Sequence, residues 1–208
     1  MKIVFNGVAP PSPETGKVGA VLGPYLEARG HELVGSEQEA DAMLDFTAPA
    51  AVVANVLRAL AAGVPCVVGT TGWEPAEVDA VARDAGLAVF HAPNFALGAV
   101  LMMRFAAEAS RHLEAAEIVE LHHATKVDAP SGTAKATAAA MRGDVPIHSV
   151  RLPGLLAHQE VILGDAGQTL SIRHDTSSRE AFGPGVLLAL SKLHELPPGV
   201  TIGLDALL

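Results

Sequence analysis

The chain has 208 residues, half of them hydrophobic, and a formal net charge of −9 at pH 7. A chain of this length can bury a sizeable core, as one large domain or two small ones. The negative charge and the lack of any run of Lys or Arg argue against nucleic acid and against an anionic membrane as partners.

The single cysteine, Cys66, cannot form an internal disulfide, which fits a reducing compartment. It lies in an apolar run, so a small buried side chain is a better interpretation than a nucleophile. The first residues lack a long apolar segment, and no apolar span of about 18 residues follows them. We therefore expect a cytoplasmic protein that is neither exported nor bound to a membrane.

Five apolar runs bounded by turn residues occur in the first 95 residues, and alanine-rich stretches with helical spacing lie between most of them. The runs are residues 2–7, 31–35, 42–47, 65–72 and 87–94. The last two are continuously apolar, as are strands of a parallel sheet that helices cover on both faces. This pattern predicts an α/β fold, with residues 1–95 as a Rossmann-like, doubly wound parallel sheet domain that binds a dinucleotide.

The pattern changes after Asn94. A long helix is expected at 97–114 and a short one at 133–142, with strands at 116–123, 146–154, 157–164 and 168–177. Residues 96–183 are therefore expected to form an α+β domain. The tail contains an apolar helix at 184–196 and a strand-like run within 200–208, so residues 184–208 are expected to return and complete the first domain.

Glycines follow the first expected strand, where a dinucleotide fold needs a tight turn that lets the pyrophosphate approach a helix N-terminus. They are Gly7, Gly16 and Gly19, and residues 8–14 interrupt the regular G-x-G-x-x-G spacing. An ordinary glycine-capped turn without a ligand explains these residues equally well.

An acidic residue is expected to hydrogen-bond the adenosine ribose of the cofactor. We assign Glu37 to this role, although Glu39 fits as well and either is also explained as a solvated loop carboxylate. No Lys or Arg lies in that loop to balance a ribose 2′-phosphate, which favours NADH over NADPH by charge alone.

Two further turns end expected strands, at the edge where ligands of parallel sheets bind. The first is GTTG, from Gly69 to Gly72. The second contains Asn94, whose amide can both donate to and accept from a carboxamide. The alternatives are a simple hydroxyl-rich turn and a hinge between domains.

Residues 120–134 carry two adjacent histidines and a lysine. Within a strand, His122 and His123 would point to opposite faces and so have different roles. A metal site is not expected, because no third ligand has clear spacing. Lys126, four residues after His122, favours a cluster that handles protons over two merely structural imidazoles.

The same stretch contains the start of a helix. Ser131 suits the N-cap, and the backbone N–H groups of Gly132, Thr133 and Ala134 would be exposed. Together with Lys126, the positive end of this helix would hold a small dianionic substrate in spite of the negative net charge.

Four segments resemble the 4-hydroxy-tetrahydrodipicolinate reductase (dihydrodipicolinate reductase) family: ELHHATKVDAPSGTA, GTTG, HAPNFALGAV and VRLPGLLAHQEVILG. The resemblance spans most of the chain. It implies an NADH- or NADPH-dependent reduction of 4-hydroxy-tetrahydrodipicolinate to tetrahydrodipicolinate, with loss of water, in lysine and diaminopimelate biosynthesis. It also implies a cytoplasmic homotetramer that assembles through residues 96–183, which would bind the substrate as well.

By this resemblance, His122 is the proton donor or acceptor and Lys126 is a second proton donor. The substrate carboxylates would bind His123, Gly132 and Thr133. Besides Glu37, the cofactor contacts would be Gly7, Gly16, Lys17, Val18, Gly69, Thr70, Thr71, Ala92, Pro93, Asn94 and Phe95.

The chain departs from the family pattern at residues 8–14, which look inserted, and before residue 41, where the segment looks shortened. These differences leave the choice between NADH and NADPH open. Two alternatives also stay open: a nucleotide-sensing or non-catalytic dinucleotide-binding protein, and a dehydrogenase of another small dicarboxylate.

Overall fold

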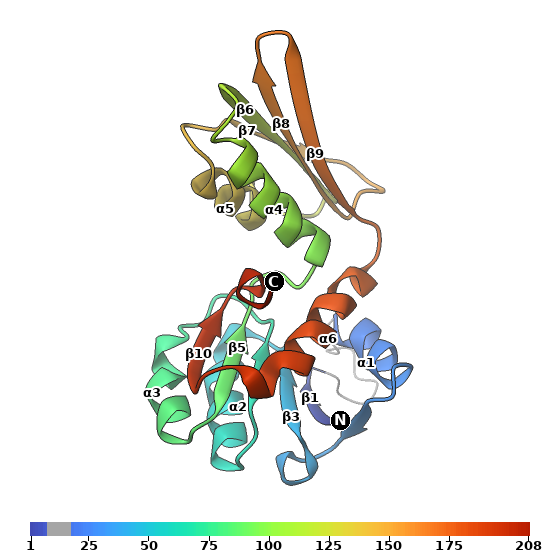
Figure 1. The fold of residues 1–208 in the computed structure, drawn as a ribbon. Coiled ribbons are helices and arrows are strands. Elements are labelled where there is room, and N and C mark those ends of the chain that lie inside the picture. Colours follow the sequence, from blue (N-terminus) through green and yellow to red (C-terminus); the bar gives the residue numbers. More distant parts are fainter. Residues whose placement is uncertain (8–17) are drawn as a thin grey trace. The chain divides into compact units, whose positions relative to one another are not determined.

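The computed structural model describes residues 1–7 and 18–208. Contacts divide the chain into two units. Unit 1 comprises Met1–Phe95 and Arg179–Leu208, and unit 2 comprises Ala96–Ser178. Figure 1 shows the elements of both units, coloured along the sequence.

Unit 1 is built on six parallel strands in the order β10-β5-β4-β3-β1-β2. The strands are β1 Lys2–Asn6, β2 Glu32–Val34, β3 Ala42–Asp45, β4 Cys66–Val68, β5 Ala88–His91 and β10 Gly199–Ile202. Strands β3, β4 and β5 are buried along their whole length, as strands of a parallel sheet with both faces covered are. The predicted doubly wound parallel sheet is therefore confirmed.

The described residues of unit 1 also form four helices and four short 3₁₀ turns. The helices are α1 Gly19–Glu27, α2 Pro49–Ala61, α3 Ala76–Asp84 and α6 Gly183–Lys192, and the turns are η1 Glu37–Glu39, η2 Arg179–Phe182, η3 Leu193–Glu195 and η4 Leu204–Leu207. Helix α2 begins with Pro49, where the missing N–H costs nothing.

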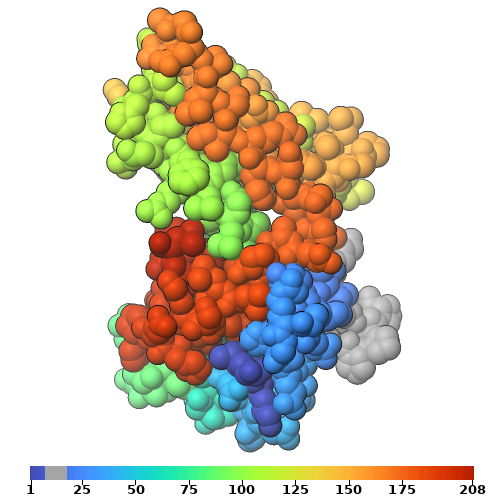
Figure 2. All heavy atoms as spheres, turned by 45° about the vertical axis from the view of Figure 1, so that its right-hand side comes forward, coloured from blue at the N-terminus to red at the C-terminus, as the bar shows by residue number. Residues whose placement is uncertain are grey.

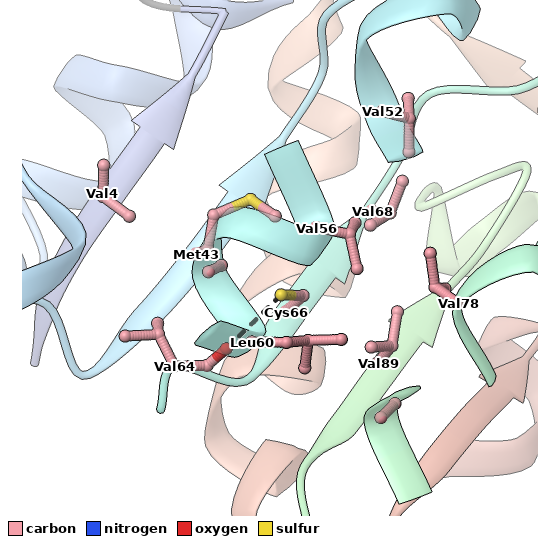
Figure 3. Packing of buried hydrophobic residues seen from close by; sticks show 12 residues of the cluster. Val4, Met43, Val52, Val56, Leu60, Val64, Cys66, Val68, Val78 and Val89 are labelled. Atoms are coloured by element: carbon pink, nitrogen blue, oxygen red, sulfur yellow. Dashed lines mark hydrogen bonds between the residues drawn. The ribbon is translucent and has the colours of Figure 1, made fainter. Parts of the chain in front are cut away.

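The core between the sheet and helices α2 and α3 is made mainly of β-branched residues (Figure 3). Val56 and Leu60 of α2 pack with Met43 of β3 and Val89 of β5. Cys66 lies among them, fully buried, and its thiol donates to the carbonyl oxygen of Val64 at 3.5 Å. Burial raises the pKa of this thiol, so Cys66 behaves as a small apolar side chain, as expected from the sequence.

The C-terminal segment lies in unit 1, where β10 pairs in parallel with β5. The sequence analysis placed the start of this segment at residue 184, whereas the structure includes Arg179–Phe182 as well. The difference arises because η2 packs against α1 and α6. A four-residue turn has no periodic pattern that would reveal this from the sequence.

Unit 2 contains a four-stranded sheet in the order β7-β6-β8-β9 and two helices. Its elements are α4 Leu97–Ala109, β6 Ala115–His122, α5 Gly132–Ala140, β7 Ile147–Arg151, β8 Ala157–Asp165 and β9 Gln168–Thr176. Strand β6 pairs in parallel with β7 and antiparallel with β8, which is antiparallel to β9. This mixed sheet is the expected α+β arrangement.

One face of the unit 2 sheet is covered by α4 and α5. Ala106 of α4 and Ala134 of α5 pack with Ile118, Val161 and Leu163 of the sheet. Most side chains of β9 are exposed, and Figure 2 shows them in orange along one surface of this unit. The alternation of buried and partly buried residues in β8 reflects the two different faces.

Helix α4 is shorter than the sequence predicts: it ends at Ala109, five residues before the expected end at 114. Ser110 is its C-cap. The Ser110 hydroxyl donates to the carbonyl oxygen of Ala107 and accepts from the amide of Arg142, and this side-chain bonding competes with further helix. None of the helices in residues 1–7 and 18–208 has the length and apolar content needed to span a membrane.

Candidate active site

The carboxyl end of β3 is organised around Asp45, a fully buried carboxylate. Its Oδ1 accepts hydrogen bonds from the amide and hydroxyl of Thr47, at 3.0 and 2.8 Å, and from the hydroxyl of Thr70, at 2.9 Å. Its Oδ2 accepts from the side-chain amide of Asn55, at 2.8 Å. Both oxygens are thus paired, as a buried charge requires. Asp45 therefore ties the GTTG loop after β4 to the end of β3.

Phe46 lies beside three loops that carry expected cofactor residues. Its ring centroid is 6.2 Å from that of Phe5 and 5.5 Å from that of Phe95. A Cβ on Gly69 would lie 2.1 Å from the Phe46 ring, and one on Gly7 would lie 2.9 Å from the Phe46 carbonyl oxygen. Gly7 also has a φ of +111°, so both the close approach of Phe46 and the backbone conformation require glycine there. The sequence analysis missed Phe46, although its place directly after a buried strand was a usable signal.

The expected cofactor residues of the loops after β4 and β5 differ in exposure. Ala92 and Phe95 are buried, so their side chains belong to the core of unit 1. Thr71 and Pro93 are exposed, and Asn94 is partly exposed. The accessible side chains at this edge are thus a hydroxyl, a proline ring and an amide.

Glu37, expected to bind the ribose, is paired with a cation that the sequence analysis did not anticipate. Arg58 of α2 donates from Nε to Glu37 Oε1 at 2.5 Å and from Nη1 to Asn55 Oδ1 at 3.1 Å. The hydrogen bond from Arg58 lowers the pKa of Glu37. No Lys or Arg lies in that loop itself, but Arg58, 21 residues away in sequence, brings a cation to Glu37, so the charge of the loop alone does not favour NADH. Glu39 is exposed.

Two of the expected first-loop residues, Gly16 and Lys17, lie outside the described residues, as does the insertion at 8–14. Val18 directly precedes α1. At the end of β1, the side-chain nitrogen of Asn6 is buried and has no hydrogen-bond partner among the described residues. Since a buried donor without an acceptor is costly, this nitrogen suits an acceptor atom of a bound molecule.

In unit 2, the expected proton-handling residues surround Glu120, which is 0% exposed. Its Oε2 accepts from His122 Nδ1 at 2.5 Å and from Arg151 Nη1 at 2.9 Å. Its Oε1 accepts from Arg151 Nη2 at 2.7 Å and from the amide of Ser131 at 3.3 Å. Burial alone would raise the pKa of Glu120, but hydrogen bonds from Arg151, Ser149 and His122 outweigh burial and lower it to about 2. Glu120 is therefore ionised near neutral pH.

This environment determines which nitrogen of His122 is free. A carboxylate can only accept, so Nδ1 carries the proton in the bond to Glu120 and Nε2 is left to exchange protons. Burial is the largest cause and lowers the pKa of His122; the hydrogen bond and charge of Glu120 raise it, and the charges of Lys126 and Arg151 lower it, so that the pKa is lowered in sum. His122 is thus neutral at rest, with its lone pair on Nε2.

The other expected residues follow β6 in the loop to α5. His123 Nδ1 lies 2.8 Å from the hydroxyl of Thr125, so the two histidines have different partners. That they have different roles stays a prediction. Lys126 Nζ donates to Asp128 Oδ1 at 2.7 Å, and this bond lowers the pKa of Asp128. No group of three or more His, Cys, Asp or Glu side chains suited to a metal occurs within residues 1–7 and 18–208.

Helix α5 begins as the sequence predicts, with Ser131 as its N-cap. The Ser131 hydroxyl accepts from the amide of Ala134 at 3.1 Å. The expected set of three exposed N–H groups is therefore wrong for Ala134, because its amide is capped. The amides of Gly132 and Thr133 have no intrahelical partner, and they form part of the positive end of the helix.

The sequence analysis also missed Glu120 and Arg151. Their registers on neighbouring strands bring them together although 31 residues separate them. One signal for Glu120 was available in the sequence. It lies two residues after Ile118 in a strand, so its side chain is on the same buried face, where an acidic residue needs a partner.

Two family models match the chain. The one described as dihydrodipicolinate reductase, N-terminus, matches residues 15–95, and the one described as dihydrodipicolinate reductase, C-terminus, matches residues 98–208.

Individual relatives agree with the family models. A 4-hydroxy-tetrahydrodipicolinate reductase of Dehalococcoides mccartyi is 46% identical over 199 residues, which cover 83% of this chain and 75% of the relative. One of Mycolicibacterium vanbaalenii is 43% identical over 236 residues, covering 93% and 95%. A solved dipicolinate-bound dihydrodipicolinate reductase from Paenisporosarcina sp. TG-14 is 28% identical, with a TM-score of 0.85 over 100% of this chain and 99% of that one.

Proposed function

Since the chain belongs to the dihydrodipicolinate reductase family, we propose that it reduces 4-hydroxy-tetrahydrodipicolinate to tetrahydrodipicolinate in lysine and diaminopimelate biosynthesis. It is an oxidoreductase that uses a nicotinamide cofactor, NADH or NADPH. One observation in the chain itself carries the proposal most strongly: the carboxylate of Glu120 holds both the ring of His122 and the amide of Ser131, where α5 begins.

The overall reaction sets what the protein must supply. A hydride replaces the hydroxyl group of the substrate, and that hydroxyl leaves with a proton as water. The reduced nicotinamide supplies the hydride when it is bound. The protein must therefore hold two carboxylates of the substrate and deliver a proton.

We assign the carboxylates to the free amides of Gly132 and Thr133, with His123 and Lys126. Amides at a helix start and an ammonium group both favour anions. Lys126 is already paired with Asp128, so a carboxylate of the substrate would compete with Asp128 for the ammonium. A dicarboxylate fits this donor set better than a neutral ring would.

We assign the proton to His122. Its Nδ1 is held by Glu120, so the neutral ring first takes up a proton from solvent at Nε2 and then delivers it from that nitrogen. The ionised Glu120 stabilises the protonated ring, while burial and the two nearby cations favour its release of the proton. Lys126 is the second proton donor in this assignment.

The nicotinamide cofactor would be held by the edge of unit 1. The fit rests on the buried side-chain nitrogen of Asn6, which has no hydrogen-bond partner in the part of the chain that the structure describes, and on the tight glycine turn at Gly7. The further contacts we assign are Gly16, Lys17, Val18, Glu37, Gly69, Thr70, Thr71, Ala92, Pro93, Asn94 and Phe95. Of these, Thr70 would offer its hydroxyl oxygen only as an acceptor, because its proton is directed to Asp45.

The domain limits, the homotetramer and the cytoplasmic location stay predictions that follow from the family resemblance. Light scattering or sedimentation of the purified chain measures the subunit number. A mass of four chains is the expected result, and a monomer would contradict it.

Absorbance of the reduced cofactor tests the function directly. The purified chain is mixed with freshly generated 4-hydroxy-tetrahydrodipicolinate and either NADH or NADPH. We expect cofactor oxidation in step with formation of tetrahydrodipicolinate, and none with an acyclic dicarboxylate. Cofactor binding without oxidation, with either nucleotide, would contradict the proposal and favour a non-catalytic binding protein.

A further inference from the structure

The carboxylate of Glu120 is linked, directly or through Arg151, to His122, to the start of α5 and to the loop that carries Lys126. It holds the His122 ring and the amide of Ser131 directly. Through Arg151 it also reaches the loop that carries Lys126, because Arg151 Nη2 donates to the carbonyl oxygen of Asp128 at 2.7 Å. The ion pair of Glu120 and Arg151 thus contacts the proton donor His122, the start of α5 and the loop that carries Lys126.

We propose that Glu120 and Arg151 are positioning residues of this reaction, which set the tautomer and the proton affinity of His122 and align it with the amides that hold the substrate. This inference rests on the proposed function for its catalytic meaning. We assign neither residue a contact with the reacting atoms, since Glu120 and the two Nη atoms of Arg151 bond mainly to each other, to His122 and to the backbone.

Burial makes this ion pair unlike an ordinary surface pair. The Glu120 side chain is 0% exposed and that of Arg151 is 18% exposed. Water therefore screens the two charges little, and the parallel pair of N–H groups on Arg151 fixes the plane of the carboxylate. The carboxylate then has a defined direction in which to hold the ring of His122.

The two residues act on His122 with opposite signs. Glu120 raises the pKa of His122 through its hydrogen bond and its negative charge, while the positive charges of Lys126 and Arg151 lower it. Among the described residues, these three are the charged groups that act on the ring, from β6, from β7 and from the loop after β6. An ion pair that did not act on the ring would leave the titration of His122 unchanged when one partner or the other is removed.

The same two strands provide a matched control. Glu117 of β6 pairs with His148 of β7 at 2.8 Å, and both side chains are more than half exposed. This pair has the same types of group on the same strands, but at a position that the reaction does not use. Glu117→Gln makes the same chemical change as Glu120→Gln.

The test is titration of the His122 ring by NMR, in the full-length chain and without cofactor or substrate. Compared with the unchanged chain, we expect the pKa of His122 to fall in Glu120→Gln and to rise in Arg151→Gln. Glu117→Gln should leave it unchanged. We also expect the ring proton of His122 to lose its fixed place on Nδ1 in Glu120→Gln.

Turnover adds a second measurement. Glu120→Gln should lower kcat by up to about 10²-fold, part of the about 10²- to 10⁴-fold that positioned proton transfer contributes. The alkaline fall of kcat/KM should move to lower pH in Glu120→Gln and to higher pH in Arg151→Gln.

If Glu120→Gln does not fold with Arg151 left unpaired, the double variant Glu120→Gln/Arg151→Gln removes both charges, and its His122 should titrate between the two single variants.

The two possible failures can be told apart. An unchanged His122 titration in both single variants, or a shift of the same sign in both, overturns the positioning role whatever the enzyme does. If the two single variants shift the pKa of His122 as expected but the unchanged protein oxidises neither NADH nor NADPH, the positioning of His122 stands and the proposed function is overturned.

Discussion

Thr70, in the loop after β4, donates its hydroxyl proton to the buried carboxylate of Asp45 at the end of β3, with 2.9 Å between Oγ1 and Oδ1. The bond joins two neighbouring strand ends at the edge where parallel sheets bind their ligands. The hydroxyl that the sequence assigned to the cofactor is therefore first of all part of the scaffold that holds this edge together.

Thr70→Val is expected to destabilise the protein by about 1–3 kcal/mol, because it removes one donor from a buried carboxylate. The neighbouring Thr71 is exposed, so Thr71→Val should change the free energy of unfolding by less than about 0.5 kcal/mol. Urea unfolding of both variants measures the difference. Equal losses of stability would contradict the role given to the Thr70 hydroxyl.

His122→Ala is expected to lower kcat by about 10²- to 10⁴-fold and to change KM much less, because it removes the proton donor and leaves the carboxylate-binding amides in place. His148→Ala is the control, since that histidine is exposed and pairs only with Glu117 among the interactions of the described residues. Steady-state kinetics with saturating cofactor measures both. A variant at position 122 with unchanged kcat would remove the assigned role.

Ser131→Ala is expected to raise KM for the substrate and to cost about 1 kcal/mol of stability, because Ser131 caps the amide of Ala134 and orders the first turn of α5. Ser191→Ala also removes a hydroxyl that bonds to a helix, but this one caps no helix start. Binding of dipicolinate by calorimetry and thermal unfolding separate the two effects. Unchanged affinity in Ser131→Ala would show that the capped helix start does not hold the dicarboxylate.

Glu37→Ala is expected to shift the cofactor preference toward NADPH, because it frees the Arg58 guanidinium from its present partner and leaves a cation for a 2′-phosphate. A tenfold rise in the ratio of kcat/KM for NADPH to that for NADH corresponds to about 1.4 kcal/mol. Glu39→Ala, two positions on and exposed, should leave the ratio unchanged. If both variants behave alike, Glu37 does not meet the ribose.

The stability that Glu120 contributes is expected to depend on pH. Its pKa is lowered from 4.5 to about 2 in the folded protein, so the unfolded chain takes up the proton first. The contribution is complete above about pH 5 and is lost as the pH falls toward 2. Unfolding of the unchanged chain and of Glu120→Gln at several pH values checks this. The difference between the two should shrink on acidification, and a constant difference would contradict the lowered pKa.

Most elements of the fold could be predicted from the sequence. Continuous apolar runs indicated β4 and β5, because a strand that is buried on both faces is apolar at every position. Helical spacing of apolar residues indicated α2 and α4, because a helix buries one stripe of its surface. The ends were less predictable. Helix α4 stops at Ala109 because a serine hydroxyl bonds back into the helix, and no apolar period records such an event.

The candidate site divides in the same way. The sequence alone determined what is local: the N-cap at Ser131, the different partners of His122 and His123, and the tight turn at Gly7, because each depends on residues close by in the chain. Only the tertiary structure decided which distant groups meet Glu120, Glu37 and Asp45, namely Arg151, Arg58 and Thr70. Strand register and helix packing, which no short motif encodes, determine which groups meet in a buried place.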